Sequence, residues 1–170
     1  NVTGVQTCAL PIWNTSKVTN MSHMFSCIKA NSIVGLNKFD TSKVTDMSGM
    51  FGTDETFFYS SKSTEIETLD IGNWDTSNVT NMSSMFTNSK FKSLILTNFR
   101  ATKLTNANEM FKGLNVEKLY IDNLDLTNVN DKYYAFDDLQ NYDKLYIQTN
   151  DSMKKFITEN YPKYASCFSK

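Results

Sequence analysis

Residues 74–86 read Trp-Asp-Thr-Ser-Asn-Val-Thr-Asn-Met-Ser-Ser-Met-Phe, and nearly the same letters recur along the chain. The copies span 13–25, 39–51, 74–86, 99–111 and 124–136, the last two in more divergent form. They begin 26, 35, 25 and 25 residues apart. A period of roughly 20–50 residues is typical of solenoids, in which each repeat packs only against its neighbours. The sequence therefore predicts a stack of about five repeats over residues 13–149.

A strand pattern follows the copies. Its segments share the order apolar-x-x-Leu-x-apolar and lie at 66–71, 91–96, 116–121 and 142–147, with a shorter version at 34–36. This is the strand pattern of leucine-rich repeats. Because side chains alternate across a strand, Leu69, Leu94, Leu119 and Leu145 are expected to form one interior row.

The copies themselves favour a different element. Val79, Met82, Met85 and Phe86 recur at the spacing of one helical face. The residues before them, from Asp75 onward, are of the turn and N-cap type. We therefore expect an α/β repeat: a leucine-rich-repeat-like solenoid with a parallel β-sheet on one face and short helices on the other.

The ends and one insertion depart from this period. Residues 2–12 resemble a translated sequencing adapter and match no repeat, so 1–12 are expected to lie outside the fold; a natural N-terminal cap strand is the alternative. An insertion occupies 52–65. At the other end, 150–162 are predicted to form a helix that covers the last repeat, because Asn150 can cap it and Pro162 stops it. Residues 163–170 are expected to be a tail.

Composition restricts the possible partners. The chain has 17 basic and 18 acidic residues without charge blocks, so nothing resembles the basic stripe of a nucleic-acid-binding protein. No apolar run reaches the ~20 residues of a membrane span. Cys27 and Cys167 lie in the first repeat and the tail, on the order of 20 Å apart at ~4.8 Å per strand, which is beyond the ~7 Å reach of a disulfide.

No motif for catalysis or metal binding is found. His23, the only histidine, stands where other repeats have Gly49 and Ser84, which indicates a surface position. No His/Cys cluster has metal-ligand spacing, and no glycine-rich phosphate loop occurs. We therefore expect no enzymatic activity, no cofactor and no metal.

Asp40 and Asp75 stand at matched positions before Thr-Ser, where calcium ligands or turn residues are both conceivable. Asn14 and Arg100 occupy the same position in two other repeats. That substitution pattern favours a turn-and-cap role over calcium binding.

The outer face of the predicted sheet is one candidate binding surface. Its residues are Asp70, Ile95, Tyr120 and Tyr146, flanked by Lys118 and Lys144. Tyrosine is enriched at protein interfaces, which favours a docking patch; the alternative is ordinary cross-strand pairing. A second candidate is the group Phe57, Phe58 and Tyr59 in the insertion, which either contacts a ligand or folds back over the core.

These repeats resemble the BspA-like leucine-rich-repeat surface proteins of bacteria, in the variant with repeats of about 25 residues. The residues that carry the resemblance are 74–86 and its relatives, the Leu-x-Leu strand and the next aromatic opener, over residues 13–147. The resemblance implies export, display at the cell surface or anchoring as a lipoprotein, and adhesion to host proteins or other cells. It carries no catalytic residues.

Two functions follow as hypotheses. The first is a bacterial adhesion module, at the cell surface or secreted, that recognises a protein or glycan through the solenoid surface. The second is a structural spacer that presents another domain at the cell surface. An enzyme is the least favoured, because no set of residues meets the requirements of a catalytic site.

Overall fold

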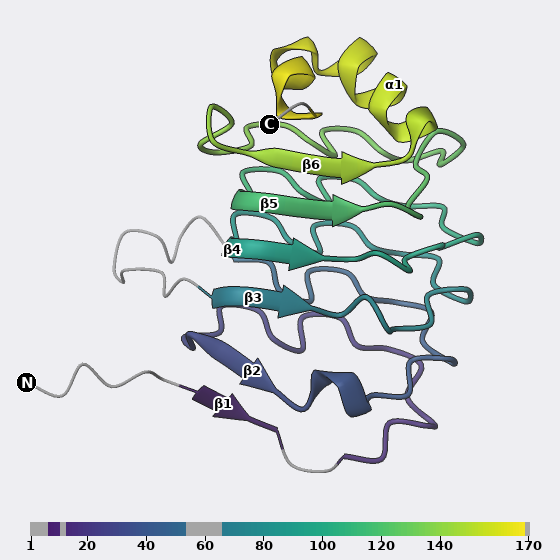
Figure 1. Ribbon diagram of the computed structural model, residues 1–170. Helices are drawn as coiled ribbons and strands as arrows, with labels where there is room; N and C mark the ends of the chain where they lie inside the picture. Colours follow the sequence, from purple (N-terminus) through teal and green to yellow (C-terminus); the bar gives the residue numbers. More distant parts are fainter. Residues whose placement is uncertain (1–6, 11–12, 54–65, 169–170) are drawn as a thin grey trace, which may run out of the picture.

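The computed structural model describes residues 7–10, 13–53 and 66–168 and forms a solenoid of stacked, parallel strands (Figure 1). The strands are β1 (Thr7–Ala9), β2 (Ser32–Val34), β3 (Ile66–Asp70), β4 (Lys90–Ile95), β5 (Asn115–Ile121) and β6 (Tyr146–Thr149). They make a two-stranded sheet, β1-β2, and a four-stranded sheet, β3-β4-β5-β6. This confirms the predicted solenoid with its parallel sheet on one face.

The interior is built from equivalent residues of successive repeats. Leu69 pairs with Leu94 and Leu94 with Leu119, and all three are at most 1% exposed. Behind them runs a stack of rings, Phe25, Phe51, Phe86, Phe111 and Phe136, with centroids 5.3, 5.7, 5.6 and 5.0 Å apart. Each repeat thus buries its apolar side chains against the next one, as the period predicts.

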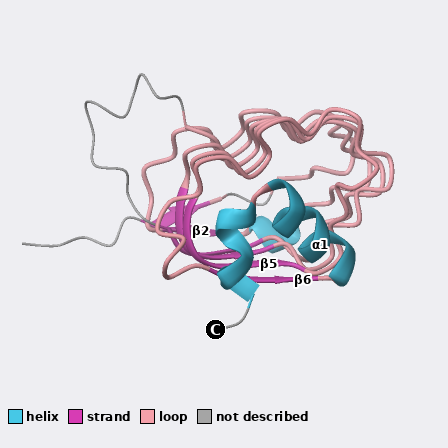
Figure 2. Cartoon of the chain, turned by 90° about the horizontal axis from the view of Figure 1, so that it is seen from above, coloured by secondary structure: helices cyan, strands magenta, loops and turns pink. Residues whose placement is uncertain are grey.

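The side opposite the sheet consists of tight turns in the described repeats, and not of the short helices that the sequence predicts. Figure 2, which looks down the stack, shows loops there. In residues 82–89, alternate backbone N–H groups bond to the next repeat: Met82 N donates to Asn106 O at 2.8 Å and Ser84 N to Asn108 O at 2.9 Å. The intervening groups form tight turns within the repeat, such as Met85 N to Met82 O at 3.2 Å.

Backbone geometry explains why these turns replace a helix. Ser84 and Asn88 have φ values of 53° and 56°, in the left-handed region, so the chain reverses its twist twice within one turn segment. An α-helix would need every amide for bonds within the segment. The helical spacing of Met82, Met85 and Phe86 nevertheless identifies buried residues correctly, since all three are fully buried.

The last strand also differs from the prediction. Asn115 forms a bridge with Gln140, but Lys118 pairs with Tyr146, so three extra residues lie between the two contacts. Residues 141–144 form a turn that leaves the sheet, and we call this segment the bulge. As a result Ile147, not Leu145, lies opposite Leu119, although Leu145 is still buried. Compared with the predicted pairing of Leu145 with Leu119, the strand is displaced by two residues, so Tyr146 keeps its outward direction.

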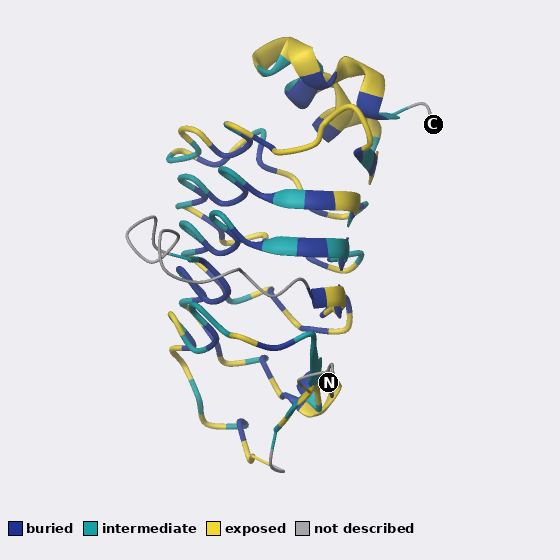
Figure 3. Ribbon diagram, turned by 90° about the vertical axis from the view of Figure 1, so that its left-hand side faces the viewer, coloured by how far each residue is buried: buried dark blue, intermediate teal, exposed yellow. Residues whose placement is uncertain are grey.

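Two helices cover the C-terminal end of the stack. α1 (Asp151–Asn160) begins at Asn150, whose Oδ1 accepts a hydrogen bond from Met153 N at 2.9 Å. The 3₁₀ helix η3 (Pro162–Phe168) follows, with Tyr164 and Cys167 buried. Residues 163–168 are therefore part of this cap and not the expected tail. Figure 3 shows its buried residues facing the stack and its exposed residues facing outward.

The N-terminal segment also lies in the stack. Thr7 pairs with Ser32, one repeat period further along the chain, so residues 7–9 add a parallel strand where the sequence analysis places nothing. This position is that of the alternative, a cap strand. The origin of residues 1–12 stays a prediction. No helix in the described segments is long and apolar enough to cross a membrane.

Candidate functional site

The outward side chains of β2–β6, which we call the sheet face, contain most of the predicted site. Strand register aligns them in two rows: Asp70, Ile95, Tyr120 and Gln148 in one, and Thr68, Ser93, Lys118 and Tyr146 in the other. Ile95, Tyr120 and Tyr146 are each partly buried. Tyr120 and Tyr146 meet edge to face, with ring centroids 6.4 Å apart and planes at 72°. The predicted tyrosine contact thus forms, although the two residues lie in different rows.

Charged groups surround these rings. Lys118 is exposed in β5 beside Tyr146. Lys144 is exposed in the bulge, which moves it out of the strand row. At the far end, Gln148 Nε2 donates to Asp122 Oδ1 at 2.9 Å. Phe57, Phe58 and Tyr59, the second candidate group, lie outside the described residues.

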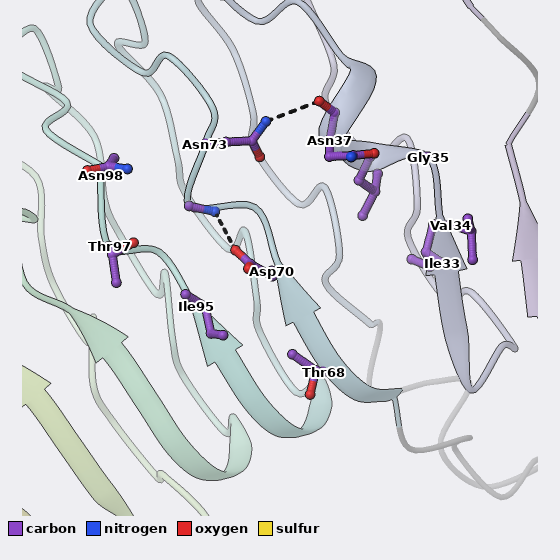
Figure 4. Close-up of a pocket in the computed structure, with 12 residues that line it drawn as sticks. Ile33, Val34, Gly35, Asn37, Thr68, Asp70, Asn73, Ile95, Thr97 and Asn98 are labelled. Atoms are coloured by element: carbon purple, nitrogen blue, oxygen red, sulfur yellow. Dashed lines mark hydrogen bonds between the residues drawn. The ribbon is translucent and has the colours of Figure 1, made fainter.

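A groove opens at the other end of the same face, where no ladder joins β2 to β3 within the described residues (Figure 4). Its volume is about 750 Å³. Side chains that line it include Ile33, Val34, Asn37, Thr68, Asp70, Asn73, Ile95, Thr97 and Asn98. Asp70 and Ile95 belong to both regions, so the groove and the tyrosines form one continuous surface.

The groove has a local cause in the first repeat. Gly35 adopts φ 105°, which only glycine reaches without strain, and turns the chain out of the sheet after Val34 into the 3₁₀ helix η1 (Leu36–Lys38). Trp74 Nε1 fixes this turn by donating to Leu36 O at 3.0 Å. Asn73 Nδ2 donates to Asn37 O at 3.2 Å across the groove. β2 thus ends at Val34, at the edge of the groove.

The asparagines of the groove are not among the site residues predicted from the sequence. A signal was available, because Asn73, Asn98 and Asn123 all stand directly before the opening residue of a repeat. The Asn123 side chain donates from Nδ2 to Thr97 O, as Asn73 does to the preceding repeat. These amides link successive turns at the carboxyl ends of the strands, where the groove opens.

The aspartates considered for calcium act as turn residues. Asp40 Oδ1 accepts hydrogen bonds from Ser42 Oγ at 2.6 Å and Ser42 N at 3.0 Å, and these bonds lower the pKa of Asp40. The N–H and hydroxyl of Ser77 lower the pKa of Asp75 in the same way. Asn14 makes the matching bond to Ser16 N at 3.1 Å, so an amide performs the same role.

No group of three or more His, Cys, Asp or Glu side chains that could hold a metal occurs among residues 7–10, 13–53 and 66–168. His23 is exposed and its ring lies over Gly49, where an added Cβ would be 2.3 Å from the ring. The three cysteines form no disulfide; Cys167 Sγ donates to Tyr142 O at 3.4 Å. The sheet face is therefore the candidate site.

Comparison with known proteins agrees with this architecture. No curated protein and no solved structure matches the chain. One family does match, over residues 2–60 and 56–169, and its description is "Mycoplasma protein of unknown function, DUF285". This is the family of BspA-like repeats, which agrees with the resemblance seen in the repeat motif. The two matches together span nearly the whole sequence, and the chain therefore belongs to the DUF285 family.

Proposed function

We propose that this chain is a non-enzymatic binding module of a bacterial cell-surface or secreted protein, and that it recognises a protein or glycan through the sheet face. The observation that supports this most is the continuity between the Ile95–Tyr120–Tyr146 cluster and the groove. Neither feature is needed to stack the repeats, since the interior rows already do so.

The sheet face has the anatomy of a protein interface. Interfaces combine central aromatic residues with a polar rim, and tyrosine is among the residues whose removal costs most binding energy. Here Tyr120 and Tyr146 lie side by side on neighbouring strands, with exposed Lys118 beside them. The strands of a laddered sheet hold such side chains in fixed positions. Little conformational entropy is therefore lost on binding.

The test replaces Tyr120 and Tyr146 together by Ser and measures adhesion of the purified protein to cultured epithelial cells and immobilised matrix proteins. Loss of two central aromatic anchors is expected to weaken binding by about 10-fold or more. Tyr133→Ser is the matched control, because Tyr133 is 70% exposed and lies on the turn side of the stack. Equal adhesion of all three proteins, with unchanged circular dichroism, would exclude the sheet face.

A structural spacer is the second candidate, and one observation favours it. Backbone hydrogen bonds join successive repeats on the turn side as well as in the sheet, for example Ser84 N to Asn108 O at 2.9 Å and Phe86 N to Met110 O at 2.9 Å. Ladders on two sides suit a stiff rod. A complete reading frame with an anchor at one end and a separate domain at the other, together with no adhesion by this chain, would support the spacer.

A further inference from the structure

The bulge at 141–144 forms one wall of a pocket in the last repeat. In the repeats that lead into β4 and β5 the chain passes from the turn segment directly into the strand, at Lys90 and Asn115, which pair with each other. In the last repeat the extra residues leave the sheet and line one side of an open pocket of about 470 Å³ beside the start of β5 and η3. In Figure 1 this region is the loop that precedes β6. Lys112, Asp138, Gln140, Asn141, Tyr142 and Lys163 line the cavity.

The wall formed by the bulge is held from three sides. Gln140 N donates to Leu114 O at 2.9 Å, and Asn141 Nδ2 donates to Asn115 Oδ1 at 2.9 Å, which ties the bulge to the previous repeat. Lys144 N donates to Asn141 O at 2.9 Å, which closes the turn. The Cys167 thiol donates to Tyr142 O at 3.4 Å and ties the bulge to the cap. The pocket is therefore preformed.

One aromatic ring forms a platform in this pocket. The Tyr142 ring packs edge-on against the buried Tyr164, with centroids 5.9 Å apart and planes at 66°. Tyr142 is still 47% exposed. A ring fixed along one edge and open to solvent offers a flat apolar surface to a ligand.

The polar groups around this ring include both signs of charge and both hydrogen-bond roles. Asp138 supplies a carboxylate, and Gln140, whose Nε2 donates to Asp138 O at 2.7 Å, supplies an amide oxygen as acceptor. Lys163 supplies an ammonium group, with Nζ 5.0 Å from the Tyr164 ring. Lys112 forms an ion pair with Glu109 at 2.7 Å, so the positive charge at the pocket is partly balanced.

This combination fits hydroxyl groups better than an ion of either sign. A hydroxyl both donates and accepts, so it can bond to carboxylate, amide and ammonium groups at the same time. An anion would be repelled by Asp138, and a cation would be repelled by the two lysines. The volume is in the range of ~300–1,000 Å³ that is usual for small-ligand sites. We propose that this pocket binds a saccharide, with hydroxyls on Asp138, Gln140 and Lys163 and the apolar face of the sugar ring on Tyr142.

The pocket is separate from the sheet face, so it adds a second recognition site to the proposed function. The experiment titrates the ¹⁵N-labelled protein with galactose, glucose, mannose, fucose, N-acetylglucosamine and N-acetylgalactosamine, each alone, and follows the amide resonances. At least one sugar is expected to shift the amides of residues 138–143 and Lys163 in a saturable way. The Tyr142→Ala and Gln140→Ala variants should each bind the sugar at least 10-fold more weakly. Gln140 is exposed, so its replacement removes no buried contact. Tyr133→Ala should bind as the unchanged protein does.

Three results would overturn the proposal: no sugar shifts these amides, both pocket variants bind normally, or inorganic sulfate produces the same shifts that the sugars do. The Tyr120→Ser, Tyr146→Ser protein separates this site from the sheet face. If it binds sugar but no longer adheres to cells, both proposals stand. If adhesion depends on the two tyrosines while no sugar binds, only the pocket proposal fails.

Discussion

At the scale of single residues, the fold depends on the close approach of successive repeats. Gly52 is buried, and a Cβ added to it would lie 2.6 Å from the backbone oxygen of Ser84 in the next repeat. At Gly72, also buried, an added Cβ would instead lie 2.7 Å from the Thr97 hydroxyl and 3.3 Å from the Thr97 backbone nitrogen. A hydroxyl can rotate away, whereas a carbonyl held by a turn cannot.

This difference makes the two glycines a matched pair. Gly52→Ala is expected to lower the free energy of unfolding by about 1–3 kcal/mol, because two repeats must separate locally. Gly72→Ala should cost less than about 1 kcal/mol. Urea denaturation of both variants measures the difference. Equal losses at the two positions would contradict the distance between repeats described here.

Residue patterns also show how far the sequence could predict the fold. The Leu69–Leu94–Leu119 row follows from the repeat period and from the alternation of side chains along a strand. Equivalent residues of successive repeats have the same surroundings. The helical spacing of Met82, Met85 and Phe86 predicts a helix in the turn segments. The spacing does not predict which acceptors the backbone N–H groups bond to. Ser84 N donates to an oxygen of another repeat, and this acceptor is identified only from the stacked structure.

At the scale of elements, the C-terminal cap is joined to the last repeat by Asn150. Its Oδ1 caps α1 through Met153 N, and its Nδ2 donates to Asp122 O at 2.9 Å and to Leu124 O at 3.2 Å. One side chain therefore begins the helix and fixes it to the turn beneath. Asn150 followed by Asp151 predicts the cap position, whereas the two bonds to the stack have no signal in the sequence.

We expect Asn150→Ala to destabilise the protein by about 1–2 kcal/mol, since the mutation removes an N-cap together with two hydrogen bonds to the previous turn. Asn160→Ala is the control, because Asn160 is exposed and its Nδ2 donates only to Phe156 O, within the same helix, among the contacts described. Thermal unfolding followed by circular dichroism compares the two. A control that loses as much stability as Asn150→Ala would show that the contacts to the stack contribute nothing.

The bulge before β6 shows why part of the candidate site was unpredictable. The letters Tyr142-Asp-Lys-Leu-Tyr-Ile147 satisfy the strand pattern, and a shift by two residues satisfies the inside–outside alternation equally well. Left-handed Asn141, with φ 52°, and the bond from Cys167 select the shifted arrangement. Lys144 consequently leaves the sheet row, and the pocket appears where the pattern indicated a strand.

At the scale of the whole molecule, the repeats are interchangeable units joined by similar interfaces. Removing residues 99–123 deletes one complete period and places Leu124 directly after Asn98, where Phe99 stands now. We expect the shortened chain to fold, with a lower unfolding free energy, because the new neighbours present equivalent surfaces. Deletion of 99–110 is the control, since it removes half a period and misaligns every following strand. Circular dichroism and urea unfolding compare the two; an unfolded full-period deletion would contradict the repeat architecture.

The ladders on two sides of the stack also determine how the molecule responds to a pulling force. Ser84 N and Phe86 N bond to the repeat that follows, and the strands do the same on the sheet side, so each repeat is held by bonds to its two neighbours. Tension between the chain ends loads these bonds one interface at a time. The protein would lengthen in steps, each releasing about 25 residues or roughly 80–90 Å of extended chain. If the chain adheres as proposed, this link would lengthen gradually under fluid shear instead of breaking at once.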